Sequence, residues 1–76
     1  MRKSKYISNN ITRLTDRETE VLKYLKKGKS NVEIAKELTI SNSTAKVHVC
    51  SIIRKMKAKD RTQAVIKAIK TGLIEI

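Results

Sequence analysis

The chain has 76 residues, of which 18 are Lys or Arg and 7 are Asp or Glu, so its formal net charge is +11 at pH 7. A chain of this length forms one small domain with a thin core, which excludes a deep substrate cleft. The strongly basic balance predicts a polyanionic partner, which is a nucleic acid, an anionic membrane surface or an acidic protein.

The residue content favours an all-α fold. The sequence has no Pro and only two Gly, so it is poor in the residues that interrupt helices and build turn-rich β folds. Its single cysteine, Cys50, excludes an internal disulfide and suits a reducing cytosol. Because the sequence has no signal-peptide pattern and no long apolar run, we expect neither secretion nor a membrane span.

In chain order, the first segment is polar and basic. Residues 1–13 (MRKSKYISNNITR) show no sustained helical or strand period. We therefore expect a basic flexible arm or linker over residues 1–13, followed by one folded domain over residues 14–76.

The first helix is predicted to begin behind Thr15. Thr15-x-x-Glu18 is a capping box, in which the hydroxyl accepts the amide of Glu18 and the carboxylate reaches back to the amide of Thr15. The residues spaced to lie on its apolar face are Val21, Leu22 and Leu25. Gly28 is expected to end the helix, because glycine tolerates the positive φ that a helix end often needs.

A second, shorter helix follows at once. Ser30-x-x-Glu33 is another capping box, and it predicts a helix of about two turns that ends near Leu38 or Thr39. The residues expected to face inward are Ile34, Ala35 and Leu38.

Residues 39–41 can form only a tight connection to a third helix. Ser41 is expected to cap this helix, which runs from Asn42 to about Met56. Its predicted buried face, at helical spacing, is Ala45, Val49, Ile52, Ile53 and Met56.

A basic segment, residues 57–61, leads to a fourth helix. Thr62 is expected to cap it, and the helix should run to about Thr71 and end at Gly72. One apolar row comprises Ala64, Val65 and Ala68, and a second row on the flank comprises Ile66, Ile69 and Leu73. The prediction is a compact all-α domain of four helices that contains a helix-turn-helix.

The outer face of the third helix suits the major groove of DNA. No acidic residue occurs from Ile40 to Ala58, and Ser41 and Thr44 lie at the helix N-terminus, where amides and the helix dipole favour a phosphate. The residues opposite the buried stripe are Ser43, Lys46, Val47, Cys50 and Arg54. Lysine has the reach to guanine and valine suits a thymine methyl, so this pattern predicts double-stranded DNA binding.

Five short motifs in fixed order strengthen this interpretation. They are LTxRExEVL from Leu14, GxSNxEIA from Gly28, ISxxTxKxH from Ile40, RTxAV from Arg61 and GLI from Gly72. From Leu14 to Ile74 the sequence resembles the GerE/LuxR-type helix-turn-helix domain, which occurs in stand-alone small regulators and as the output domain of response regulators.

The resemblance implies a four-helix fold whose third helix reads the major groove. It assigns phosphate and base contacts to Thr44, Lys46 and Val47, with Lys55 as a further phosphate contact. It also implies DNA-backbone contacts at the start of the second helix, Ser30 and Asn31, and at Thr62. Dimerisation through the fourth helix is common in this family, and the second apolar row, Ile66, Ile69 and Leu73, agrees with it.

The chain departs from the usual family pattern at several positions of the third helix. Ala45 stands where the family usually has Val, and Met56 where it has Leu, which predicts a locally repacked core. Ser51 stands where the family usually has Asn, and so lacks an amide able to contact the DNA backbone. Some members carry a basic residue in place of Cys50.

The sequence therefore predicts sequence-specific DNA binding for bacterial transcription regulation, by a homodimer on a two-fold-symmetric site. We expect a cytoplasmic protein that is nucleoid-associated when bound, and RNA polymerase is a further partner that this interpretation allows. No cofactor and no metal are expected, because His48 and Cys50 point apart on their helix and a zinc site needs four ligands.

Two alternatives stay open. One is a promoter-binding module similar to region four of a sigma factor, although the RTxAV and GLI motifs argue against it. The other is a small helical adaptor whose basic face binds an acidic protein. An enzyme is disfavoured, since the sequence shows no paired carboxylates placed for acid–base work, no nucleophile with a base and no glycine-rich phosphate loop.

Overall fold

The computed structural model describes residues 13–75, which contain four α-helices and no strand. The helices are α1 (Asp16–Lys26), α2 (Asn31–Leu38), α3 (Asn42–Lys55) and α4 (Arg61–Thr71). This confirms the predicted all-α, four-helix fold. The predicted basic arm, residues 1–13, lies outside the described residues except for Arg13.

A polar side chain stands in front of each helix and accepts a hydrogen bond from the backbone amide three residues further on. These N-cap residues are Thr15, Ser30, Ser41 and Asp60. Both predicted capping boxes are complete, because Glu18 and Glu33 accept the amides of Thr15 and Ser30 at 2.9 Å and 2.8 Å.

The prediction that Thr62 caps the fourth helix is wrong. Asp60 is the cap, and its Oδ1 accepts the amide of Gln63 at 2.8 Å, so α4 begins at Arg61. A carboxylate satisfies the free amide and also interacts favourably with the positive end of the helix dipole, which a hydroxyl does less well. Thr62 lies in the first turn of α4 and is exposed.

The four helices also end alike, at a residue with positive φ. These residues are Gly28, Thr39, Lys57 and Gly72, with φ of 81°, 56°, 54° and 83°. At each end the following amide reaches back to a carbonyl of the last turn, as from Lys29 to Tyr24 and from Leu73 to Ala68. The predicted roles of Gly28 and Gly72 as helix ends are confirmed.

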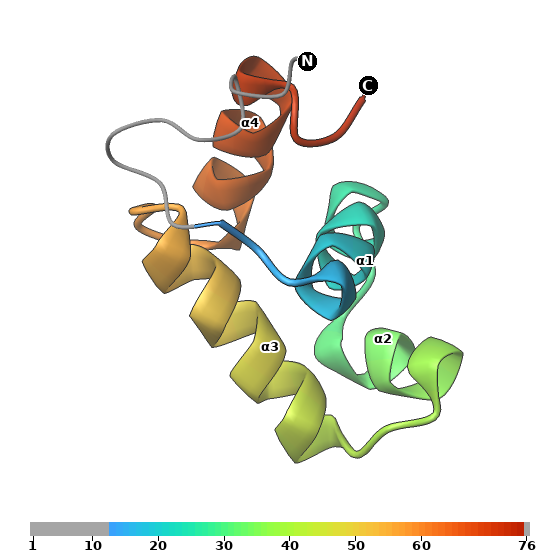
Figure 1. Cartoon of the computed structure of the whole chain (residues 1–76). Coiled ribbons are helices and arrows are strands. Elements are labelled where there is room, and N and C mark those ends of the chain that lie inside the picture. Colours follow the sequence, from blue (N-terminus) through green and yellow to red (C-terminus); the bar gives the residue numbers. More distant parts are fainter. Residues whose placement is uncertain (1–12, 76) are drawn as a thin grey trace.

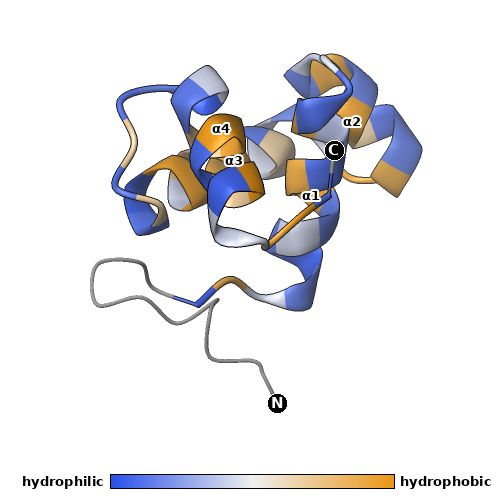
Figure 2. Cartoon of the chain, turned by 90° about the horizontal axis from the view of Figure 1, so that it is seen from above, coloured by the Kyte–Doolittle hydropathy of each residue, from blue (hydrophilic) through white to orange (hydrophobic). Residues whose placement is uncertain are grey.

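Helix α3 contacts all three other helices. In Figure 1, α1 and α2 lie along one side of it, and α4 lies beside its C-terminal end. Figure 2 shows apolar and polar residues interleaved along the helices, as expected when each contributes one face to a shared core. That core comprises Leu14, Val21, Leu22, Leu25, Ile34, Ala35, Ala45, Val49, Ile52, Met56, Ala64, Ala68 and Ile74.

The predicted core differs from the observed one at its edges. Leu38 and Ile53, which were expected to face inward, pack against the core but are only partly buried. Ile74, beyond the end of α4, is 5% exposed and belongs to the core. Lys26 of α1 holds this tail by donating to the carbonyl of Glu75 at 2.7 Å. None of the described helices has the length and apolar character needed to cross a bilayer.

Candidate nucleic-acid interface

Helices α2 and α3 and the residues between them form a helix-turn-helix. Thr39 ends α2 in the left-handed conformation, and the amide of Ile40 donates to the carbonyl of Ala35 at 3.0 Å. The Ile40 side chain is partly buried and packs against the core, and Ser41 then caps α3. The turn therefore spans three residues, as predicted, and holds α2 packed against α3.

The residues predicted for the outer face of α3 lie together on one exposed surface. Ser43, Thr44, Lys46, Val47, Cys50 and Arg54 are all exposed, and Val47 is 64% exposed. Lys46, Val47, Cys50 and Arg54 line a shallow hollow together with Ser51. An aliphatic side chain this exposed, with a cation on either side along the helix, matches a surface that meets both base edges and phosphates.

The N-terminus of α3 is open and free of acid. The Ser41 hydroxyl donates to Thr44 Oγ1 at 2.9 Å and accepts the Thr44 amide at 3.0 Å. The first turn of α3 contains no acidic residue, whereas those of α1 and α2 do. The positive end of the α3 dipole is thus left available to an anion such as phosphate.

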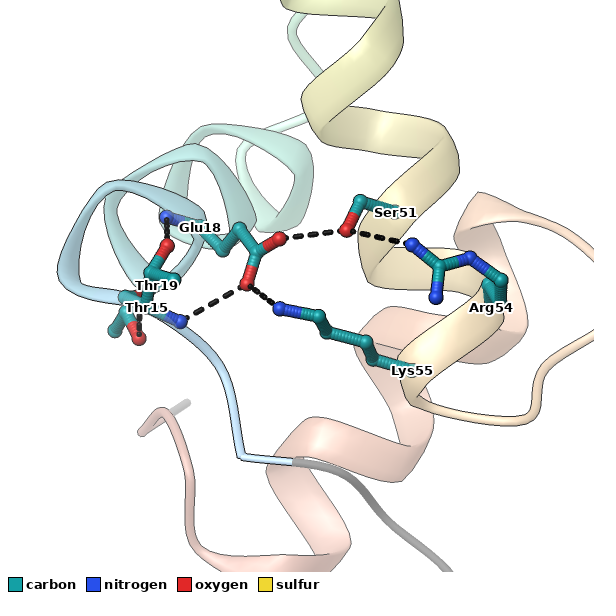
Figure 3. Close-up of polar contacts among 6 residues, drawn as sticks. All are labelled: Thr15, Glu18, Thr19, Ser51, Arg54 and Lys55. Carbon is teal, nitrogen blue, oxygen red and sulfur yellow. Dashed lines mark hydrogen bonds and ion pairs between the residues drawn. The ribbon is translucent and has the colours of Figure 1, made fainter.

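Lys55, which the family resemblance assigns to phosphate, points into the fold instead of outward. Its Nζ lies 2.8 Å from Glu18 Oε1, and its side chain is 18% exposed (Figure 3). Contact with a phosphate would have to use a donor of the ammonium that Glu18 does not occupy.

Glu18 is a buried charged residue of α1, with 5% of its surface exposed. Both of its carboxylate oxygens accept hydrogen bonds. Its Oε1 accepts from Lys55 and from the amide of Thr15, and its Oε2 accepts from the Ser51 hydroxyl at 2.6 Å. Burial alone would raise the pKa of Glu18. The hydrogen bonds from Lys55, Ser51 and Thr15 outweigh burial and lower that pKa from 4.5 to about 2.

Ser51 connects this buried cluster to the outer face of α3. Its hydroxyl donates to Glu18 and accepts from Arg54 Nη2, which lies 3.4 Å away. Figure 3 shows the continuous path from Glu18 through Ser51 to Arg54. Ser51 stands where the family usually has an asparagine, and in the structure its hydroxyl donates to Glu18.

The other predicted backbone contacts gather where α2 and α4 begin. Arg61 Nη2 donates to Asn31 Oδ1 at 2.6 Å, and Arg61 Nη1 donates to the carbonyl of Lys29 at 3.3 Å. Ser30 and Thr62, which adjoin these residues, are exposed. This bridge, formed by Arg61 with Asn31 and Lys29, joins the start of α2 to the start of α4.

The apolar row predicted as a dimer interface is uneven in exposure. Ile66 of α4 is 47% exposed, whereas Ile69 and Leu73 are partly buried and pack against the core. Ile66 is therefore the member of this row that presents most apolar surface to a partner.

The polar cluster formed by Glu18, Ser51, Arg54 and Lys55 was not predicted from the sequence. The capping box identified Glu18, but Ser51 and Lys55 lie 33 and 37 residues further along the chain. The helical spacing of α1 places Glu18 on the same face as Val21, Leu22 and Leu25, which indicates its burial but not its partners. Within residues 13–75 no three His, Cys, Asp or Glu side chains group as metal ligands.

Comparison with known proteins identifies the family to which the helix-turn-helix belongs. Residues 12–68 match the family described as bacterial regulatory proteins, luxR family. The chain is similar to the transcriptional regulatory protein DegU of Brevibacillus brevis, with 48% identity over 63 residues, which cover 83% of this chain and 27% of that protein. It is likewise similar to the response regulator protein VraR of Staphylococcus aureus, with 48% identity over 62 residues, which cover 82% of this chain and 30% of that protein.

A solved structure shares the fold. The crystal structure of the response regulator ChrA, from a heme-sensing two-component system, superposes with a TM-score of 0.79 and 35% sequence identity, over 93% of this chain and 35% of that one. The chain thus spans about a third or less of the length of these relatives. With its helix-turn-helix between Asn31 and Lys55, the chain belongs to the luxR family of bacterial regulatory proteins.

Proposed function

We propose that this domain binds double-stranded DNA in a sequence-specific manner to regulate bacterial transcription, with α3 inserted in the major groove. Family membership supports DNA-binding transcription regulation as the general function. The observation that carries the finer proposal is the outer face of α3, where exposed cations flank an exposed valine and no acid occurs from Ile40 to Ala58.

Each exposed residue of this face has a role suited to its chemistry. Lys46 and Val47 would meet base edges, by hydrogen bonds to guanine and by contact with a thymine methyl. Ser43, Thr44 and Arg54 would contact phosphates at the two ends of the inserted segment. At the side, Ser30, Asn31 and Thr62 would contact the DNA backbone, and Cys50 would lie against the groove between Lys46 and Arg54.

The first test is fluorescence anisotropy of the protein on random-sequence duplex DNA over a salt series, followed by selection of bound sequences. If several phosphates are contacted, affinity should fall steeply, by roughly a thousandfold or more between 50 and 200 mM salt for six or more contacts. Enrichment of a two-fold-symmetric site supports the proposal. An absence of binding at the lowest salt would contradict it and favour an acidic protein partner for the basic face.

Lys46→Ala tests base reading by α3. If Lys46 contacts a base, the substitution should weaken binding to the selected site by roughly 1–3 kcal/mol and leave binding to random DNA much less affected. The measurement is the ratio of the two dissociation constants at one salt concentration. Equal weakening on both duplexes would show that Lys46 contacts only phosphate.

The second part of the proposal is a homodimer through α4, which would bind two half-sites about one helical turn apart. Ile66 supports this, because an exposed isoleucine on a helix flank is available to a second copy. Ile66→Glu should abolish cooperative binding to a two-half-site duplex, because a carboxylate would be buried unpaired in the interface.

A duplex with one half-site is the control for Ile66→Glu. The added negative charge acts on both duplexes through the general field, whereas loss of the dimer affects only the two-half-site duplex. Because Ile66 lies outside the core, the variant should keep the circular dichroism of the parent. Unchanged cooperativity in the folded variant would place the dimer interface elsewhere.

A further inference from the structure

The last turn of α3 carries two adjacent cations whose surroundings differ. Arg54 is exposed and lines the hollow on the outer face, whereas the ammonium of Lys55 is bound to the buried carboxylate of Glu18. The two side chains nevertheless belong to one hydrogen-bonded cluster. Ser51, one helical turn before them, contacts both Glu18, the partner of Lys55, and Arg54.

The direction of each hydrogen bond in this cluster is determined by chemistry. A carboxylate with its pKa lowered to about 2 is ionised at neutral pH and can only accept. The single proton of the Ser51 hydroxyl is therefore committed to Glu18 Oε2, at 2.6 Å. The lone pairs of the Ser51 oxygen are then left to accept from Arg54 Nη2, and donation to a charged acceptor makes the hydroxyl a better acceptor in turn.

We propose that Ser51 is a positioning residue for DNA binding, whose hydroxyl, held by the Glu18 carboxylate, orients the Arg54 guanidinium on the outer face of α3. This inference rests on the proposed function, since it assumes that Arg54 contacts DNA. A guanidinium that is free to rotate loses side-chain entropy when it binds a phosphate, and one already directed by a neighbour loses less. Ser51 thus increases the affinity that Arg54 contributes without touching the DNA itself.

The test is a double-mutant cycle on DNA affinity, measured with the full chain on one duplex at one salt concentration. The variants are Ser51→Ala, Arg54→Ala and both together. With serine at position 51, removing Arg54 should weaken binding about tenfold, as for the loss of a charge-assisted contact. With alanine at position 51, removing Arg54 should weaken binding only about threefold. Ser51→Thr keeps the hydroxyl and should restore the full effect of removing Arg54.

A parallel cycle of Ser51→Ala with Lys46→Ala is the matched control. Lys46 belongs to the same face, but the hydrogen bonds of the Ser51 hydroxyl go to Glu18 and Arg54, so the two effects should combine as a simple product. Loss of fold stability in Ser51→Ala would change both cycles alike, and circular dichroism at the assay temperature shows whether each variant is folded. Only a positioning role changes the Arg54 cycle alone.

Each outcome separates this inference from the proposed function. An effect of Arg54→Ala that is the same with serine and with alanine at position 51 overturns the inference and leaves the proposed function intact. The same holds if Lys46→Ala weakens binding but Arg54→Ala does not. If neither substitution changes affinity, α3 is not the DNA-binding surface, and the proposed function is overturned together with the inference.

Discussion

Glu18→Ala is expected to lower the free energy of unfolding by about 3 kcal/mol, because it removes one partner of a buried ion pair. The ammonium of Lys55 would lose its counter-charge, and the Ser51 hydroxyl and the Thr15 amide would lose their acceptor. A domain of this size is stable by only several kcal/mol, so the variant should be close to unfolding at room temperature. Urea denaturation followed by circular dichroism at pH 7 measures the change.

Glu20→Ala, in the same helix, is the control for Glu18→Ala. Glu20 pairs with Arg17 at 3.5 Å, but both side chains are about half exposed, at 51% and 44%. An exposed pair of this kind contributes little, so the free energy of unfolding should change by less than about 0.5 kcal/mol. If the two variants lost the same free energy of unfolding, the buried ion pair of Glu18 would contribute no more to stability than the exposed pair of Glu20.

The pH dependence of stability gives a second measure of Glu18. Its pKa is about 2 in the fold and 4.5 as the ordinary value, so the folded state favours the ionised form. The stabilisation from ionised Glu18 is therefore fully present above pH 4.5 and is lost as the pH falls through about 2. Over this pH range, the free energy of unfolding of the unsubstituted protein should fall by roughly 3 kcal/mol more than that of Glu18→Ala. A difference between the two proteins that stays constant from pH 5 to pH 2 would contradict this account.

Ile52→Ala is the second substitution with a large expected effect. Ile52 is 0% exposed and lies on the inner face of α3, the helix that contacts the other three. Truncation removes buried methyl groups and leaves a cavity, which together should lower the free energy of unfolding by about 3–4 kcal/mol. Because DNA binding requires the folded domain, the apparent affinity should also fall as the unfolded population rises.

Ile66→Ala makes the same chemical change at a site that is 47% exposed. It leaves no closed cavity, so we expect a loss below about 1 kcal/mol in the same urea experiment. Comparable losses at the two positions would mean that the core is not packed around Ile52 as the structure describes.

The helices of this fold were predictable because the signals that begin and end them are local. A hydroxyl and a glutamate three residues apart define the starts of α1 and α2, and glycines define the ends of α1 and α4. The start of α4 was predicted two residues late. Asp60 and Thr62 are both good cap residues, and the sequence alone does not show which amide each side chain reaches.

Contacts between distant residues account for what the sequence did not predict. The exposed face of α3 was predictable from helical spacing, since every residue opposite the buried stripe is exposed. The engagement of Lys55 by Glu18 was not, because it depends on how α1 crosses α3 and not on the pattern of either helix. The burial of Ile74 depends in the same way on the chain turning back after Gly72 to lie beside α1.

The bridge from Arg61 to Asn31 and Lys29 has a consequence for the DNA sites that a dimer can use. It fixes α4, which would carry the dimer contact, relative to the helix-turn-helix within one subunit. In the proposed dimer, the separation and the angle between the two copies of α3 then follow from the subunit structure. One added base pair moves a half-site by about 3.4 Å and turns it by about 35°, which a rigid pair of subunits does not accommodate. If the proposed dimer forms, the tolerated length of the operator spacer would depend on an arginine that lies outside the outer face of α3.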